Sequence, residues 1–145
     1  MLSEHFSLDE FTASQEATRH GINNKPSEKV VENLRMLATL LEQVRTLLGG
    51  GAIRISSGYR SLALNRHIGS NDTSAHVRGY AADFTCPAFG TPIEVAKKIA
   101  ESNLKFDQLI YEGTWVHISC DPQNRRQLLT ARFKDGHTYY TTGIA

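Results

Sequence analysis

The sequence predicts an α+β fold in which helices pack on a small, mainly antiparallel sheet. Apolar residues recur at helical spacing before Gly49, whereas most of the alternating, β-branched segments follow Ala81. Helices that come early and strands that come late favour this class over an alternating α/β sheet. The length of 145 residues, with no internal repeat, linker or low-complexity segment, predicts a single domain over residues 1–145.

Two helices are expected ahead of the first strand. Ser7 and Glu10 form a capping box that precedes a first helix, expected over Leu8–His20. Pro26 opens a longer helix whose apolar residues recur at three- and four-residue steps until Gly49 ends it. This apolar stripe should form the main helix of the core.

Shorter elements fill the rest of the chain. Helices are expected at Leu62–Ile68 and Thr91–Ser102, and strands at Ile53–Ser56, Ala81–Cys86, Phe106–Glu112, Trp115–Cys120, Leu128–Phe133 and Thr138–Thr141. The pair Gly113-Thr114, with glycine first, predicts a two-residue type II′ hairpin, and Asp135-Gly136 predicts a second hairpin. Polar residues Ser70–Ser74 are expected to form a loop that delivers His76.

Composition and charge exclude several functional classes. Hydrophobic residues make up 40% and charged residues 21% of the chain, with a net charge of +1, as in an ordinary globular protein. Scattered Lys and Arg predict no nucleic-acid interface, and the basic pair Arg125-Arg126 is expected at a solvated strand edge without a function. Neither a signal peptide nor a run of roughly 18 apolar residues is visible, which predicts synthesis in the cytoplasm and no membrane span.

Three residues stand out as candidates for chemistry. His76 and His117 each lie beside strand-forming sequence, and Asp83 interrupts the apolar run Ala81–Phe84. A carboxylate in such a strand needs a positive partner, because burying an unpaired charge is costly. That partner is either a metal ion, since two imidazoles and one carboxylate with an open fourth position form a recurrent catalytic zinc arrangement, or a salt bridge from Arg60 or Arg78.

Two rival constellations are disfavoured. Ser74, His76 and Asp83 could form a serine-hydrolase triad, but the sequence has no G-x-S-x-G elbow. Cys86 or Cys120 could act as a nucleophile with His117, but each follows a candidate ligand by three residues, an odd offset that places it on the opposite sheet face. We expect both to be buried, reduced and poorly reactive thiols that lie near each other on adjacent strands.

Three motifs follow one another along the chain: Ser57–Ser61 reads SGYRS, Ser74–Asp83 matches S-x-H-x-x-G-x-A-x-D, and Trp115–Ser119 reads WVHIS. Together they resemble the zinc D-Ala-D-Ala carboxypeptidase family, the M15 peptidases. The resemblance implies a Hedgehog/D,D-peptidase-like fold and Zn²⁺ held by the residues matching the family's ligands, which are His76, Asp83 and His117. It also implies hydrolysis of stem or cross-link peptides of bacterial peptidoglycan, by a D-Ala-D-Ala carboxypeptidase or an endopeptidase.

The same resemblance implies a cation near the scissile group at Arg60. Its guanidinium could hold a substrate carboxylate or stabilise the oxyanion of the reaction, and the alternative is a structural ion pair with Asp83 or Asp72. Ser74 and Trp115, which flank the candidate ligands, are expected to contact the substrate with Arg60.

The position of the catalytic carboxylate departs from a common family pattern. Many members carry E-x-x-H, but Thr114 stands three residues before His117, and Glu112 stands five before it. If Gly113-Thr114 is the hairpin loop, Glu112 lies opposite Trp115 and on the metal face, so Glu112 is the predicted base. The alternatives are a solvated turn residue at this position and Asp107 as the base.

These observations predict a monomeric zinc metallopeptidase with a peptidoglycan peptide as its substrate. Small family members without a signal peptide are often phage or prophage lysis enzymes, so release to the cell wall by a holin, or carriage in a virion, is expected. The alternative, which the departure at Thr114 favours, is a non-catalytic zinc-containing module for wall binding or virion structure.

Overall fold

Five α-helices, one 3₁₀ helix and six strands make up the fold in the computed structural model, which describes residues 1–145. The helices are α1 (Leu8–Thr12), α2 (Gln15–His20), α3 (Glu28–Leu47), α4 (Leu62–His67) and α5 (Pro92–Ala100), with the 3₁₀ helix η1 at Ala75–Arg78. The strands are β1 (Arg54–Ser57), β2 (Ala81–Thr85), β3 (Gln108–Tyr111), β4 (Val116–Ser119), β5 (Gln127–Lys134) and β6 (His137–Thr142). None of the helices has both the length and the apolar character that crossing a membrane requires.

All six strands join one sheet in the order β1-β2-β4-β3-β5-β6. Every neighbouring pair is antiparallel except β3 and β5, which run parallel. The predicted α+β class with a mainly antiparallel sheet is therefore confirmed.

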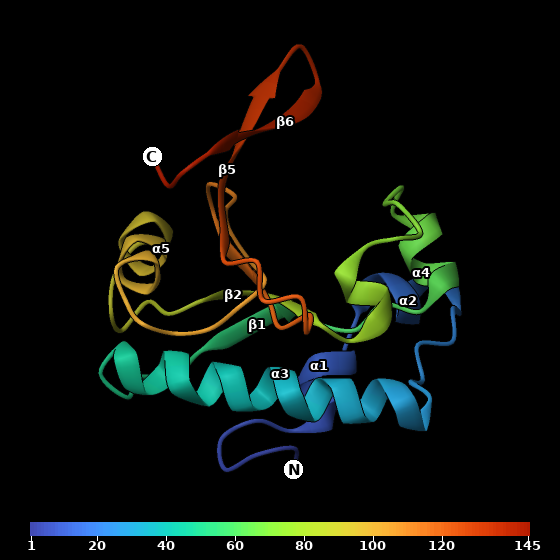
Figure 1. The fold of residues 1–145 in the computed structure, drawn as a ribbon. Coiled ribbons are helices and arrows are strands. Elements are labelled where there is room, and N and C mark those ends of the chain that lie inside the picture. Colours follow the sequence, from blue (N-terminus) through green and yellow to red (C-terminus); the bar gives the residue numbers. More distant parts are fainter.

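The helices α3 and α5 cover one face of the sheet. In Figure 1, α3 runs beneath β1 and β2, and its buried stripe includes Leu37 and Leu41. These side chains belong to one apolar cluster with Phe84 of β2, Ile118 of β4 and residues of α5. Because successive strand residues point to opposite faces, burying Phe84 in this core turns its neighbour Asp83 toward the other face.

The expected helix over Leu8–His20 is wrong, because two short helices occupy this stretch. Ala13 has an extended backbone (φ −63°, ψ 132°), and the side chain of Ser14 accepts a hydrogen bond from the Ala17 N–H as the N-cap of α2. A residue that caps a new helix cannot continue the old one. The break lets α1 bury Phe11 in the core while α2 lies beside α4 (Figure 1).

Both predicted hairpins are confirmed. In the first, Ile110 pairs with His117, and the Glu112 N–H donates to the Trp115 carbonyl at 3.1 Å. Gly113 has a φ of 88°, which a first-position glycine in this turn supplies without strain. In the second hairpin Asp135 and Gly136 both have positive φ, at 52° and 77°, as a type I′ turn requires.

The expectation of a solvated edge is wrong for Arg126, which is half-buried, whereas Arg125 is exposed. Arg126 has a φ of 51°, its Nε donates to the Leu104 carbonyl at 3.0 Å, and its guanidinium lies 4.8 Å from the centre of the Phe106 ring. Arg125 binds the carboxylate of Asp107. Both arginines hold the chain where it enters β5, and Arg125 supplies the donors that the buried Asp107 carboxylate requires.

The two cysteines face the core, on the side of the sheet opposite the candidate ligands. The expectation that they lie near each other is wrong. Each cysteine stands three residues after a paired ligand, Asp83 or His117, and in antiparallel strands these steps run in opposite directions. The Cys120 N–H donates to the Tyr80 carbonyl at one end of the ladder, whereas Cys86 follows Phe84, the last paired residue at the other end. Burial raises the pKa of the Cys120 thiol to about 12.

Candidate metal centre

Two of the candidate ligands come from neighbouring strands and stand directly opposite each other. Asp83 of β2 pairs with His117 of β4 in the antiparallel ladder, and both point away from the core formed by α3 and α5. The ring nitrogen Nδ1 of His117 lies 2.9 Å from Oδ1 of Asp83. Both side chains are buried, with 8% of Asp83 and 11% of His117 exposed, so the sheet fixes their relative position.

The helix η1 brings the third ligand to this pair. Ser74 caps η1 by accepting a hydrogen bond from the His76 N–H, and Gly79 ends it with a φ of 78°. A Cβ at Gly79 would lie 2.9 Å from Val30 Cγ1, so a glycine lets this turn pack closely on α3. The His76 Nδ1–H donates to the Gly58 carbonyl at 2.7 Å, which leaves Nε2 free to act as a ligand.

The potential ligand atoms of His76, Asp83 and His117 all lie within 4.8 Å of one another. Oδ1 of Asp83 is 3.3 Å from His76 Nε2 and 2.9 Å from His117 Nδ1. These separations are near the edge of about 3.3 Å that a tetrahedron with zinc–ligand bonds of about 2.0–2.1 Å would have. Two nitrogens and one carboxylate oxygen suit Zn²⁺, so the residues present fit this ion.

Burial and mutual attraction set the charge states of His76 and Asp83. Burial lowers the pKa of His76, which favours the neutral imidazole that a metal requires. Burial alone would raise the pKa of Asp83, but His76 and His117 outweigh it and hold this pKa well below its usual range. The cluster therefore presents an anionic carboxylate between imidazoles.

Arg60 lies at the edge of the ligand cluster in a fixed position. Its Nε donates to Ser57 Oγ at 3.1 Å and its Nη1 to Asn65 Oδ1 at 3.2 Å. Its Nη2 lies 3.5 Å from Oδ2 of Asp83, the oxygen that the imidazoles leave free. Of the two salt-bridge partners considered for Arg60, Asp83 contacts it, whereas Asp72 binds Arg66 at 2.8 Å.

Glu112 lies beside the cluster with its carboxylate oriented by an indole. The Trp115 Nε1–H donates to Oε2 of Glu112 at 2.9 Å across the hairpin turn. Burial, and next the negative charge of Asp83, raise the pKa of Glu112 above its ordinary value. A raised carboxyl pKa in a cleft is typical of groups that exchange protons during catalysis.

One cavity of about 530 Å³ contains every site residue that the sequence predicted. These residues are Arg60, Ser74, His76, Asp83, Glu112, Trp115 and His117. Such a volume lies within the usual range of ligand sites. The structure thus brings the three sequence motifs together around one space.

The cavity also contains Tyr140, which the sequence did not indicate, and Asp107, which the sequence offered as an alternative base. Tyr140 reaches it from β6, and burial raises the pKa of its hydroxyl. Asp107 lines it as well, but Arg125 binds both carboxylate oxygens, so Asp107 is a paired structural carboxylate rather than a free base. The alternation of side chains along the predicted hairpin indicates which sheet face Tyr140 occupies. Its contact with the cavity, however, depends on the parallel pairing of β3 with β5.

The fold and the site together define a candidate metallohydrolase: a mainly antiparallel sheet carries three convergent ligands, a carboxylate with a raised pKa and a fixed arginine. The Peptidase M15 family model matches residues 4–119, which is most of the chain, and the chain therefore belongs to the Peptidase M15 family. Membership identifies the protein as a peptidase. A comparison with curated proteins gave no match. The matched segment includes all three candidate ligands, whereas β5 and β6 lie beyond it.

Proposed function

We propose that the protein is a zinc-dependent peptidase that hydrolyses peptide bonds in bacterial peptidoglycan. The observation that carries this proposal is the convergence of His76, Asp83 and His117 in the cavity that also holds Glu112. Membership in a peptidase family supports peptide hydrolysis as the reaction. The peptidoglycan substrate rests on the resemblance of the three motifs to D-Ala-D-Ala carboxypeptidases.

The zinc ion would be held by His76 through Nε2, by Asp83 through Oδ1 and by His117 through Nδ1. When bound, zinc supplies a Lewis acid that polarises the scissile carbonyl and makes water acidic enough to react near neutral pH. The Gly58 carbonyl keeps the His76 ring oriented, and Arg60 keeps the Asp83 carboxylate oriented. Such outer partners fix ligand geometry before the metal arrives.

Glu112 is the proposed general base and later the general acid. Its carboxylate would accept a proton from the attacking water and pass it to the leaving amine. Burial raises the pKa of this carboxyl above its ordinary value, which suits a group that both accepts and releases a proton. The indole of Trp115 prevents the carboxylate from turning away.

Arg60 is the proposed anchor for the substrate. Ser57 and Asn65 hold two sides of its guanidinium, so the remaining N–H groups are fixed in direction. A planar fork of this kind binds a substrate carboxylate bidentately or stabilises negative charge that develops on the carbonyl oxygen. Ser74 and Trp115 line the same cavity and would contact the rest of the peptide.

The test of this proposal is the variant Glu112→Gln, assayed on defined peptidoglycan with mass spectrometry of the released fragments. Gln keeps the shape but cannot accept a proton, so the rate should fall by about 10²–10⁴-fold while stoichiometric zinc is retained. Glu101→Gln, at an exposed carboxylate where α5 ends, is the matched control and should cut at the parental rate. The fragments also distinguish a D-Ala-D-Ala carboxypeptidase from an endopeptidase. Unchanged hydrolysis by Glu112→Gln would remove Glu112 from its role.

A second function, a non-catalytic wall-binding or virion module, is favoured by one observation. Thr114 occupies the position three residues before His117, where many family members have glutamate, and it is exposed in the turn. This function predicts that the parent binds zinc and peptidoglycan but releases no fragment from any wall chemistry. Release of fragments by the parent protein, stopped by a zinc chelator, would exclude the non-catalytic function.

A further inference from the structure

A second cluster of metal-binding side chains lies outside the catalytic cavity, where α2 meets α4. Glu16 and His20 are four residues apart and share one face of α2, and His67 is the last residue of α4. We propose that Glu16, His20 and His67 form a binding site for a divalent transition-metal ion such as Zn²⁺ or Ni²⁺. This site is separate from the proposed catalytic zinc site and does not depend on the proposed function.

The geometry of the cluster fits the ligand spacing of a metal site. Oε2 of Glu16 lies 3.4 Å from His20 Nε2 and 3.4 Å from His67 Nε2, and the ligand atoms are all within 4.8 Å of one another. These separations are again close to the edge of about 3.3 Å expected for tetrahedral zinc ligation. Two imidazoles and one carboxylate repeat the donor set of the catalytic centre, a set that suits zinc and nickel.

The neighbours of the cluster direct its ligand atoms inward. Arg19 binds the other carboxylate oxygen of Glu16, with Nη1 at 3.3 Å from Oε1, so Oε2 is left for the imidazoles. The rings of His20 and His67 lie 4.4 Å apart between their centres, which brings both Nε2 atoms to the same side of the carboxylate. All three side chains are partly exposed, at 44% for Glu16 and His20 and 36% for His67, so an ion can enter and complete its shell with water.

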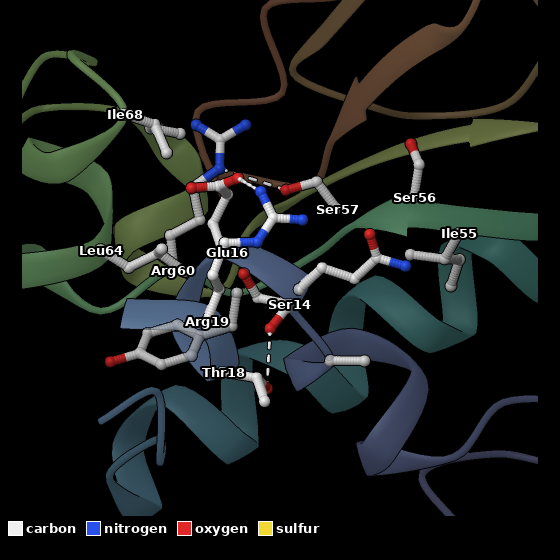
Figure 2. A pocket seen from close by; sticks show the side chains of 13 residues that line it. Ser14, Glu16, Thr18, Arg19, Ile55, Ser56, Ser57, Arg60, Leu64 and Ile68 are labelled. Atoms are coloured by element: carbon white, nitrogen blue, oxygen red, sulfur yellow. Dashed lines mark hydrogen bonds and ion pairs between the residues drawn. The ribbon is translucent and has the colours of Figure 1, made fainter. Parts of the chain in front are cut away.

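An ion at this site would tie the N-terminal segment to α4. Between α2, β1 and α4 lies a wide groove of about 980 Å³, drawn in Figure 2, whose lining includes Glu16, Leu64 and Arg60. Asn65, also on α4, accepts the hydrogen bond from Arg60 Nη1. Metal binding would therefore stiffen the wall of the groove that Arg60 also lines, and the site would be structural or regulatory rather than hydrolytic.

The first experiment counts ions. Equilibrium dialysis of the full chain against Zn²⁺ or Ni²⁺, followed by elemental analysis, should give two ions per chain, and His20→Ala/His67→Ala should retain one. The matched control is His137→Ala, an exposed histidine in the last hairpin that belongs to no cluster, and it should retain both. His76→Ala/His117→Ala should also retain one ion, which separates the two sites. Equal stoichiometry in the parent and His20→Ala/His67→Ala would overturn the inference.

The second experiment uses the unaltered protein, so it does not depend on the folding of a variant. Diethylpyrocarbonate modifies exposed imidazoles, and the modified positions are mapped by mass spectrometry with and without Zn²⁺. Zinc should protect His20 and His67 several-fold, because a coordinated Nε2 cannot react, and should leave His137 unprotected. Equal modification of His20 and His67 in both conditions would show an ordinary ion-pair cluster and no metal site.

Discussion

At the residue scale, the hydrogen bond from Trp115 to Glu112 limits how far burial raises the pKa of the proposed base. Burial raises the pKa of Glu112, and the Trp115 N–H opposes this shift because it stabilises the charged carboxylate. Trp115→Phe removes this hydrogen-bond donor, so the pKa of Glu112 should rise further. A base acts when it is deprotonated, so the acid limb of the kcat/KM profile should move to higher pH.

The measurement is kcat/KM on a defined wall peptide across the acid range. Tyr139→Phe, which alters an exposed aromatic residue of β6 outside the cavity, serves as the control and should keep the parental profile. A loss of substrate contact alone would lower kcat/KM equally at every pH. An acid limb that stays in place, or moves to lower pH, contradicts the argument.

The pair Asp107–Arg125 makes a second prediction at this scale. Nε and Nη2 of Arg125 donate to the two carboxylate oxygens at 2.9 and 2.8 Å, and these bonds lower the pKa of Asp107. We expect Arg125→Ala to reduce the free energy of unfolding by about 1–2 kcal/mol at neutral pH, a modest value because Arg125 is half exposed.

The pH dependence of that loss has a definite sign. A carboxyl whose pKa is lowered by folding stabilises the fold above its unfolded pKa of about 3.9, and this contribution is lost as the pH falls through the folded value. Urea unfolding of the parent and Arg125→Ala should therefore differ at pH 7 and converge in acid. Arg132→Ala, at an exposed position of β5, should change stability by less than about 0.5 kcal/mol. A difference in unfolding free energy between the parent and Arg125→Ala that widens in acid would refute a stabilising Asp107–Arg125 ion pair.

At the element scale, local chemistry decided which features the sequence could predict. The hairpin at Gly113-Thr114 fixed the register of β3 and β4, because a two-residue loop leaves one pairing. The break between α1 and α2 was missed because Ser14 is compatible with a helix interior as well as with a cap. The pairing of β3 with β5 is long-range, so the contribution of Tyr140 to the cavity had no local signal.

The turn between β1 and α4 carries the third prediction. A Cβ at Gly58 would lie 2.5 Å from the Phe11 carbonyl oxygen and 2.8 Å from its Cα, both backbone atoms that cannot move alone. Gly58→Ala should therefore lower the free energy of unfolding by about 1–3 kcal/mol. Because the Gly58 carbonyl orients His76, zinc affinity should fall as well.

Chemical denaturation and a zinc titration test both parts of the Gly58 prediction. Ala63→Ser, at an exposed position of nearby α4, likewise adds one non-hydrogen atom but without a backbone clash, and should change neither quantity by much. Parental stability and zinc affinity in Gly58→Ala would show that α1 can yield and that His76 keeps its orientation without this turn.

At the scale of the whole molecule, the sheet separates stability from chemistry. The core cluster of 20 buried residues occupies the face covered by α3 and α5, whereas the three candidate ligands face the opposite side. Alternation along β2 and β4 places Phe84 and Ile118 on one side and Asp83 and His117 on the other, and this parity was readable from the sequence. What the sequence did not reveal is that the second hairpin, outside the family match, completes the cavity with Tyr140.

This separation leads to the last prediction, which concerns metal removal. Because the core does not include the ligands, the chelated protein should still unfold cooperatively, and zinc should add stability by mass action alone. At a free zinc concentration of 100 times Kd the gain is about 2.7 kcal/mol, or about 5–11 °C in Tm for a chain of this size. Calorimetry in the His20→Ala/His67→Ala background restricts the measurement to the catalytic centre, and adding His76→Ala/His117→Ala should abolish the zinc-dependent shift while leaving a single transition. If the chelated protein shows no cooperative transition, the metal is part of the scaffold. If all four substitutions together leave the shift intact, zinc binds elsewhere and the assigned ligands are wrong.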